Sequence, residues 1–230
     1  MTSPAAASST GIADEAPSAA GKPRLRGVFH AYGFVAFAVL GAALVAATSG
    51  GRERLAAAVF GTALVLTFGV SALYHRVDWR PSARRVMRRL DHASIYLLIA
   101  GTYTPYGLLV LSGAWQFSIL GVVWIGAAAA IVQQVVWLDA PRWLPVAAGI
   151  VLGWVGLLAV PQIVEAAGFS GTFLVAAGGV FYTLGAVVYA VKRPDFRPAV
   201  FGYHELFHVL TVLAASCQFA AVTLLVADRS

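Results

Sequence analysis

Apolar residues fill seven long stretches of the chain, and short segments rich in Gly, Pro and charged residues separate them. A helix needs about 20 mostly apolar residues to cross the hydrocarbon core of a bilayer. The pattern therefore predicts an all-α membrane protein with seven transmembrane helices. The predicted spans are residues 28–48, 55–75, 91–111, 115–137, 143–160, 171–191 and 204–226. Pro161 is expected to close the fifth span, with a loose apolar loop after it.

The chain divides into two parts of unequal length. Residues 1–26 are rich in Ala, Ser and Pro and lack the basic-then-apolar order of a signal peptide, which predicts a disordered cytosolic tail. Residues 27–230 are expected to form a single seven-helix transmembrane domain. The lone cysteine, Cys217, excludes an intramolecular disulfide and a cysteine-based zinc knuckle.

Composition supports the membrane interpretation and narrows the function classes. The chain is 60% hydrophobic and 11% charged, whereas an ordinary soluble domain is about 45–50% apolar and about 25% charged. So few charges exclude a soluble enzyme, a disordered chain and a nucleic-acid-binding module. We expect an integral, multi-pass protein of the plasma (inner) membrane, with membrane lipids as its partners and no nucleic acid.

The basic residues predict the orientation. With the N-terminus placed inside, thirteen of the sixteen Lys and Arg residues fall in cytoplasmic segments, and only Arg52, Arg54 and Arg229 fall outside. Cytoplasmic loops of membrane proteins carry an excess of Lys and Arg. The partition predicts an N-terminus inside and a C-terminus outside, and it explains the sequence pI of 9.8 without a nucleic-acid partner.

This topology brings ionisable residues from three spans to one depth. His75 ends the second span on the cytoplasmic side, and Asp91 opens the third span on the same side. His204 and His208 occupy the first two turns of the seventh span. Ionisable groups inside spans are costly and usually functional, so these residues are candidates for a site.

Their spacing suits a metal. His204 and His208 are four residues apart, so both rings lie on one helical face about 6 Å apart. A catalytic zinc typically has three protein ligands and one open position. We predict His75, His204 and His208 as ligands of Zn²⁺. Asp91 would accept a proton from a zinc-bound water or bind the metal itself, and Ser71, one turn before His75, would bond a substrate carbonyl or orient the water.

Other interpretations of these residues remain open. A single histidine is often an interfacial residue with one wet edge, and we expect this structural role for His30 and His92. Residues 204–208 also match the H-E-x-x-H pattern of zinc proteases, in which Glu205 would be the general base. No acidic ligand follows that motif nearby, which argues against a protease.

Asp91, Ser94, Leu98 and Thr102 form one stripe of the third span. This stripe is expected either to line a substrate cavity or to pack against a neighbouring helix.

The motifs at these positions resemble the hemolysin III family, which belongs with the progestin and adiponectin receptor group and more distantly with alkaline ceramidases. The matching elements are S-x-x-x-H at 71–75, D-H at 91–92, G-T-Y-T-P at 101–105 and H-x-x-x-H at 204–208. The resemblance implies seven helices, an inside N-terminus and zinc near the cytoplasmic face, bound by His75, His204 and His208 beside Asp91 and Ser71. One departure is Gln218, where many members of that family carry a histidine.

The predicted function is zinc-dependent hydrolysis of a lipid amide or ester, as the likeness to ceramidases implies. The alternative is a cytolytic pore or a non-enzymatic membrane effector with structural zinc, which the family name suggests. No polar stripe crosses the spans to line a wide pore within one chain.

Overall fold

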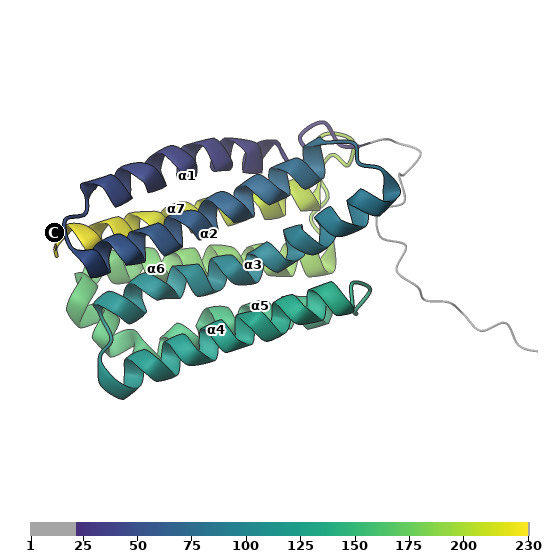
Figure 1. The fold of residues 1–230 in the computed structure, drawn as a ribbon. Coiled ribbons are helices and arrows are strands. Elements are labelled where there is room, and N and C mark those ends of the chain that lie inside the picture. Colours follow the sequence, from purple (N-terminus) through teal and green to yellow (C-terminus); the bar gives the residue numbers. More distant parts are fainter. Residues whose placement is uncertain (1–21, 230) are drawn as a thin grey trace, which may run out of the picture.

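The computed structural model describes residues 22–229, and within that range the chain forms a bundle of long helices without a strand (Figure 1). This confirms the predicted all-α class. The elements are α1 (Val28–Ala47), α2 (Gly51–Arg76), α3 (Pro81–Leu109), α4 (Gly113–Val136), α5 (Trp143–Trp154), the 3₁₀-helix η1 (Val155–Ala159), α6 (Val160–Val191) and α7 (Tyr203–Ala227).

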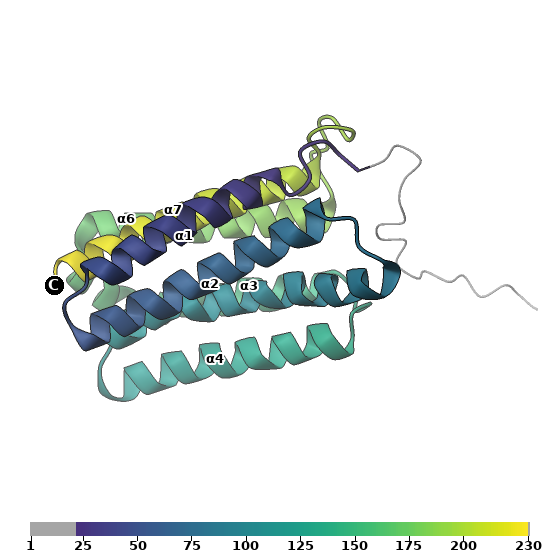
Figure 2. The same cartoon turned by 45° about the horizontal axis from the view of Figure 1, so that its top comes forward.

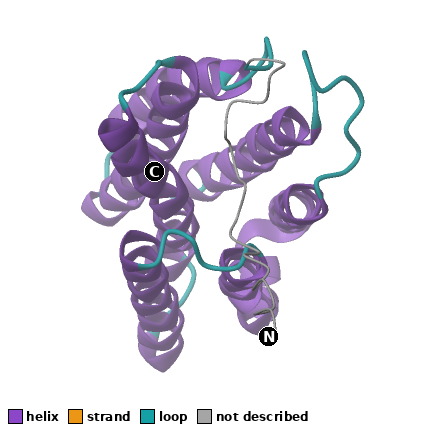
Figure 3. Cartoon of the chain, turned by 90° about the vertical axis from the view of Figure 1, so that its right-hand side faces the viewer, coloured by secondary structure: helices purple, strands orange, loops and turns teal. Residues whose placement is uncertain are grey.

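Helices that are consecutive along the chain pack side by side. The most extensive contacts join α1 to α2, α2 to α3, and α6 to α7. Helix α7 also contacts α1, α2 and α3, so the last helix lies against the first three (Figure 2). Figure 3 shows the bundle from its end, with the connecting loops toward the viewer. This arrangement brings the end of α2 beside the start of α7.

Small residues let α2 approach both of its neighbours. A Cβ added at Gly41 of α1 would lie 3.4 Å from the Cα of Gly61, and a Cβ added at Gly101 of α3 would clash with Ala63. Such contacts between small residues are typical of helices packed within membranes. The close contact between α2 and α3 also sets how near the side chains of one helix, such as His75, lie to those of the other, such as Asp91.

The exterior of the bundle fits a hydrocarbon environment. Within residues 22–229, five helical stretches are long and apolar enough to cross a membrane: Val28–Ala47, Gly51–Arg76, Gly113–Val136, Trp143–Val191 and Tyr203–Ala227. Large apolar side chains such as Phe117, Ile125 and Phe169 are exposed on their surfaces, as lipid-facing residues are. The protein is therefore a multi-pass integral membrane protein, as predicted. The count of seven spans and the orientation stay predictions.

Helix α3 begins ten residues before the predicted third span. Pro81 stands in its first turn, where the missing N–H of proline costs no hydrogen bond. The four arginines at positions 84, 85, 88 and 89 follow within the same helix. The predicted span 91–111 is thus the later part of a longer helix, and Asp91 lies inside α3 rather than at its start.

The predicted loop after Pro161 was wrong. Pro161 stands in the first turn of α6, which runs on through Glu165. The helical geometry breaks instead at Gly168, whose φ of 62° and ψ of −171° are open only to glycine. The break divides α6 into two segments. The first continues from α5 and η1, and the second ends at Val191.

Between α5 and α6 the helix tightens into η1, and Tyr103 of α3 bonds to the backbone there. The Tyr103 hydroxyl donates to the Gly153 carbonyl and accepts from the Gly156 N–H, both at 2.7 Å. The change from α-helix to 3₁₀-helix leaves backbone groups without a partner inside the helix. In a bilayer such groups must be hydrogen-bonded within the protein, and the Tyr103 hydroxyl provides these bonds. They also fix α3 against this segment.

Candidate metal centre

Three buried histidines meet where α2 ends and α7 begins. The ring centroids of His75, His204 and His208 are 4.7–4.9 Å apart, and each residue is at most 7% exposed. One nitrogen from each ring can be chosen so that all three lie within 4.8 Å of one another. The cluster can therefore hold a metal ion, and no other group of His, Cys, Asp and Glu in residues 22–229 is so placed.

The donor atoms suit zinc in type and spacing. The Nε2 atoms of His75 and His204 are 3.3 Å apart. Two imidazole nitrogens bound tetrahedrally at about 2.0–2.1 Å from zinc stand about 3.3 Å apart, as simple geometry gives from that bond length. This pair of nitrogens therefore fits two corners of such a site, and His208 offers a third nitrogen within 4.8 Å of both.

Local helix geometry explains how the ligands converge. His204 and His208 are one turn apart in α7 and both face α2, while His75 lies in the last turn of α2. Gly27, just before α1, packs closely on His75, since a Cβ there would lie 2.6 Å from the His75 Cβ. Its φ of 75° also favours glycine.

Asp91 and Ser71 lie beside the histidines. The Oδ2 atom of Asp91 is 3.7 Å from Nε2 of His75, and its side chain is 13% exposed. Ser71 is buried one turn before His75 in α2. Both residues line the same cavity as His204 and His208. The Asp91 carboxylate and the Ser71 hydroxyl, both predicted to take part in catalysis, thus line the cavity next to the histidines.

His30 of α1 joins this cluster, which sequence reasoning did not foresee. Its ring stacks on that of His208, with centroids 3.8 Å apart and planes at 8°. Phe68 packs edge-on against its other side at 4.8 Å. The sequence places His30 at the start of the first span, at the same depth as the other histidines. It has no second candidate ligand three or four residues away, so the sequence did not indicate that it joins the cluster. His30 lacks the wet edge expected of an interfacial histidine, since it is only 3% exposed, and its ring instead covers one face of His208.

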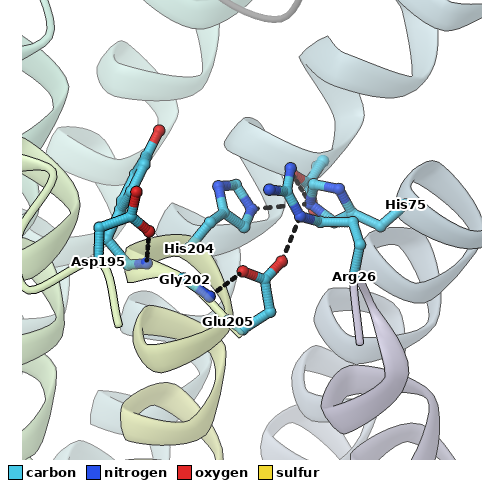
Figure 4. A network of polar contacts seen from close by, with 8 residues as sticks. Arg26, His75, Asp195, Gly202, His204 and Glu205 are labelled. Carbon is cyan, nitrogen blue, oxygen red and sulfur yellow. Dashed lines mark hydrogen bonds and ion pairs between the residues drawn. The ribbon is translucent and has the colours of Figure 1, made fainter. Parts of the chain in front are cut away.

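Glu205 points away from the histidines, although it follows His204 directly. Its Oε1 pairs with Nε of Arg26, and its Oε2 accepts the Gly202 N–H at 2.9 Å (Figure 4). The second bond is half of a capping box at the start of α7. Both carboxylate oxygens are thus engaged in a buried position, so Glu205 is not placed as the general base that the H-E-x-x-H interpretation requires.

The segment before α1 is tied to the loop before α7. The N–H groups of Arg24 and Leu25 donate to the carbonyls of Ala199 and Val200 at 3.1 and 3.3 Å. These bonds bring Arg26 to Glu205. Residues 1–21 of the predicted tail lie outside the described residues, while residues 22–26 lie against the bundle.

A cavity of about 310 Å³ opens beside the histidines and extends between α3, α5, α6 and α7. Its walls are mainly apolar, and its volume is near the lower limit of small-molecule sites. Asp91, Ser94, Leu98 and Thr102 all line it, so the predicted stripe of α3 faces a cavity. His92 lines it as well.

Comparisons with known proteins agree with these motifs. The family described as "Haemolysin-III related" matches residues 19–219. Hemolysin-3 of Bacillus cereus is 28% identical over 71% of this chain and 72% of its own length. The Hemolysin-3 homolog of Bacillus subtilis (strain 168) is 30% identical over 71% and 74%. The human monocyte to macrophage differentiation factor is 25% identical over 84% and 79%.

Proposed function

The chain belongs to the haemolysin-III related family of membrane proteins, and from that premise we propose that it is a zinc-dependent hydrolase of a membrane lipid. The bond cleaved is an amide or an ester, as in a ceramidase. One observation carries the proposal. The Asp91 carboxylate stands 3.7 Å from His75 of the three-histidine cluster, and Asp91, His204 and His208 line an apolar cavity.

The ligand set comprises His75, His204 and His208. Bound there, zinc would supply a Lewis acid that polarises a carbonyl oxygen and makes water more acidic. Asp91 accepts the proton of the attacking water and passes it to the leaving amine or alcohol. Ser71 donates a hydrogen bond to the carbonyl oxygen, on which negative charge develops during attack.

The cavity explains why a lipid is the favoured substrate. Its walls are mainly apolar and suited to hydrocarbon, and Asp91, Ser71, His204 and His208 are among the residues that line it. A lipid whose scissile bond joins a polar headgroup to a hydrocarbon chain could place that bond beside these polar groups and its chain along the apolar walls. Binding of the chain would hold the bond beside Asp91, which lowers the entropy cost of reaction.

The orientation belongs to the same proposal. With seven spans and the N-terminus inside, the histidine cluster lies near the cytoplasmic face, because α1 starts and α2 ends there. Thirteen of sixteen basic residues then fall on the cytoplasmic side, as the positive-inside rule requires.

A second candidate function is a non-enzymatic membrane effector, either cytolytic or held together by structural zinc. The printed name of the Bacillus cereus relative, Hemolysin-3, favours it. The two candidates differ in the role of Asp91. A structural zinc site is closed by a fourth protein ligand, which Asp91 could supply, whereas a hydrolase keeps that position open and uses Asp91 as a proton acceptor.

The test is a hydrolysis assay on the purified full chain in mixed micelles. N-acyl sphingosine and a glycerolipid ester serve as amide and ester substrates, and released fatty acid is measured. We expect release by the wild type and its loss in Asp91→Asn. Asp78→Asn is the matched control, because the Asp78 side chain is 97% exposed and pairs with Lys22 at the surface. No release from either substrate by zinc-loaded wild type would contradict the proposal.

A further inference from the structure

Three polar side chains on the cavity wall have oxygen atoms without a partner. They are Tyr106 of α3, Tyr182 of α6 and Gln218 of α7, and all three line the cavity that begins at the histidines. Both tyrosine hydroxyls and the Gln218 Oε1 are buried and have no hydrogen-bond partner among the described residues. Buried polar atoms in folded proteins are normally hydrogen-bonded, so three unpaired oxygens on one cavity wall indicate that a ligand completes them.

Gln218 lies far from the candidate metal centre. It follows His208 by ten residues in the same helix, which is about 15 Å along its axis. The Gln218 amide and the metal centre therefore occupy different depths of one cavity. We name Gln218, with Tyr106 and Tyr182 of the same cavity, the deep polar subsite.

The orientation of Gln218 leaves an acceptor available. Its Nε2 donates to the Val175 carbonyl at 3.1 Å. Gly178 makes room for the amide, since a Cβ there would lie 2.6 Å from that Nε2. The donor end of the amide is thus held by α6, and the unpaired Oε1 is left to accept a hydrogen bond.

The chemistry of the subsite selects a hydroxyl group. A ligand hydroxyl can donate to the Gln218 Oε1, and its own oxygen can still accept a hydrogen bond, as from a tyrosine hydroxyl. A keto oxygen only accepts, so it would leave the Gln218 Oε1 unpaired. A plain methylene chain would leave all three oxygens unpaired.

We propose that the deep polar subsite recognises a hydroxyl group on the hydrocarbon chain of the bound lipid, remote from its headgroup. The substrate class rests on the proposed function, because it takes the metal centre as the position of the scissile bond. A distance of about 15 Å corresponds to roughly ten to twelve carbon–carbon bonds of about 1.5 Å in a zigzag chain. The hydroxyl recognised therefore lies near the twelfth carbon of an acyl chain.

The test uses binding, so it does not depend on turnover. The full chain in nanodiscs is titrated with octadecanoic, 2-hydroxyoctadecanoic and 12-hydroxyoctadecanoic acids, each displacing a fluorescent fatty acid. Two new hydrogen bonds predict about tenfold tighter binding of the 12-hydroxy acid than of octadecanoic acid. The 2-hydroxy acid, whose hydroxyl lies beside the carboxylate, is expected to show no such gain.

Three variants assign the preference to the subsite. Gln218→Leu, Tyr182→Phe and Tyr106→Phe each keep the apolar bulk and remove a polar oxygen. We expect Gln218→Leu to lose most of the preference for the 12-hydroxy acid, and at least one of the two Phe variants to reduce it. Tyr32→Phe is the matched control, because Tyr32 is 73% exposed outside the cavity, and it should keep the full preference.

Each other outcome overturns the proposal. Equal binding of the 12-hydroxy and unsubstituted acids by the wild type, an unchanged preference in Gln218→Leu and both Phe variants, or no binding of any acid would all contradict it. The ratio of affinities is read without hydrolysis. A chain that discriminates but does not hydrolyse contradicts only the proposed function, and one that hydrolyses without discriminating contradicts only the subsite.

Discussion

Glu205 and Arg26, 179 positions apart in the sequence, form an ion pair that joins the first turn of α7 to the residues before α1. Glu205 is 1% exposed and the Arg26 side chain 18%. A buried charge whose partner is removed is strongly destabilising. This pair therefore has a structural role beside the histidines, which gives the first prediction.

We expect Arg26→Ala to lower the free energy of unfolding by about 3 kcal/mol, because Glu205 would be left buried and unpaired. Thermal unfolding in detergent measures the loss. Lys22→Ala is the matched control, because Lys22 pairs with the almost fully exposed Asp78, and surface pairs contribute little. Equal stability of the two variants would contradict this role for Arg26.

Glu205→Gln separates the ion pair from the helix cap. Glutamine at this position can still accept the Gly202 N–H, so the variant removes the charge and keeps the cap. We expect reduced stability but lipid hydrolysis within a few-fold of the wild type, compared at equal amounts of folded protein. A loss as large as that of Asp91→Asn would mean instead that Glu205 is the general base.

Asp91→Asn removes the proton acceptor and leaves the three histidines in place. General acid–base groups typically contribute about 10²–10⁴-fold to rate. We expect turnover to fall by at least about 100-fold, while zinc content and the unfolding temperature stay near wild type. A variant that loses its zinc as well would assign Asp91 to metal binding.

His30 is expected to act through His208 rather than as a ligand. Its ring stacks on His208, and loss of groups that orient metal ligands typically lowers metal affinity about 10–100-fold. We predict a loss of this size for His30→Ala, and a much smaller loss for His30→Phe, which keeps a stacking ring. Competition with a zinc chelator gives both affinities. If His30→Phe lost as much zinc as His208→Ala, the result would show that His30 is itself a zinc ligand.

The orientation can be tested by labelling single cysteines in intact cells. Cys217→Ala removes the native thiol, and a cysteine is then placed at Arg52 or at Arg193. With seven spans and an inside N-terminus, a membrane-impermeant maleimide labels position 52 in intact cells and position 193 only after lysis. The reverse pattern would place the histidine cluster at the outer face.

The sequence was sufficient to predict the helical class, because hydropathy directly reflects burial in lipid. The sequence was less reliable for helix ends, whose positions depend on backbone geometry. Pro161 suggests a helix end, yet proline fits a first helical turn as well, and the break falls at Gly168, where a positive φ is required. The observed break in the helix therefore lies seven residues after Pro161, where the fifth span was expected to end.

The candidate site shows the same division. The depth of His75 and the spacing of His204 and His208 could be read from the sequence, and the three rings do meet. His30 could not be assigned, because its stacking on His208 depends on how α1 packs against α7. The engagement of Glu205 depends on Arg26, which sequence reasoning had placed in a disordered tail.

Zinc analysis of the purified protein tests the central claim most directly. Metal content is measured by mass spectrometry for the wild type and for His208→Ala, after purification without added metal or chelator. We expect about one zinc per wild-type chain, as three histidine ligands support, and well under half of that amount in folded His208→Ala. A folded wild type without stoichiometric zinc, and unable to take it up when zinc is supplied, would contradict a zinc site at these histidines.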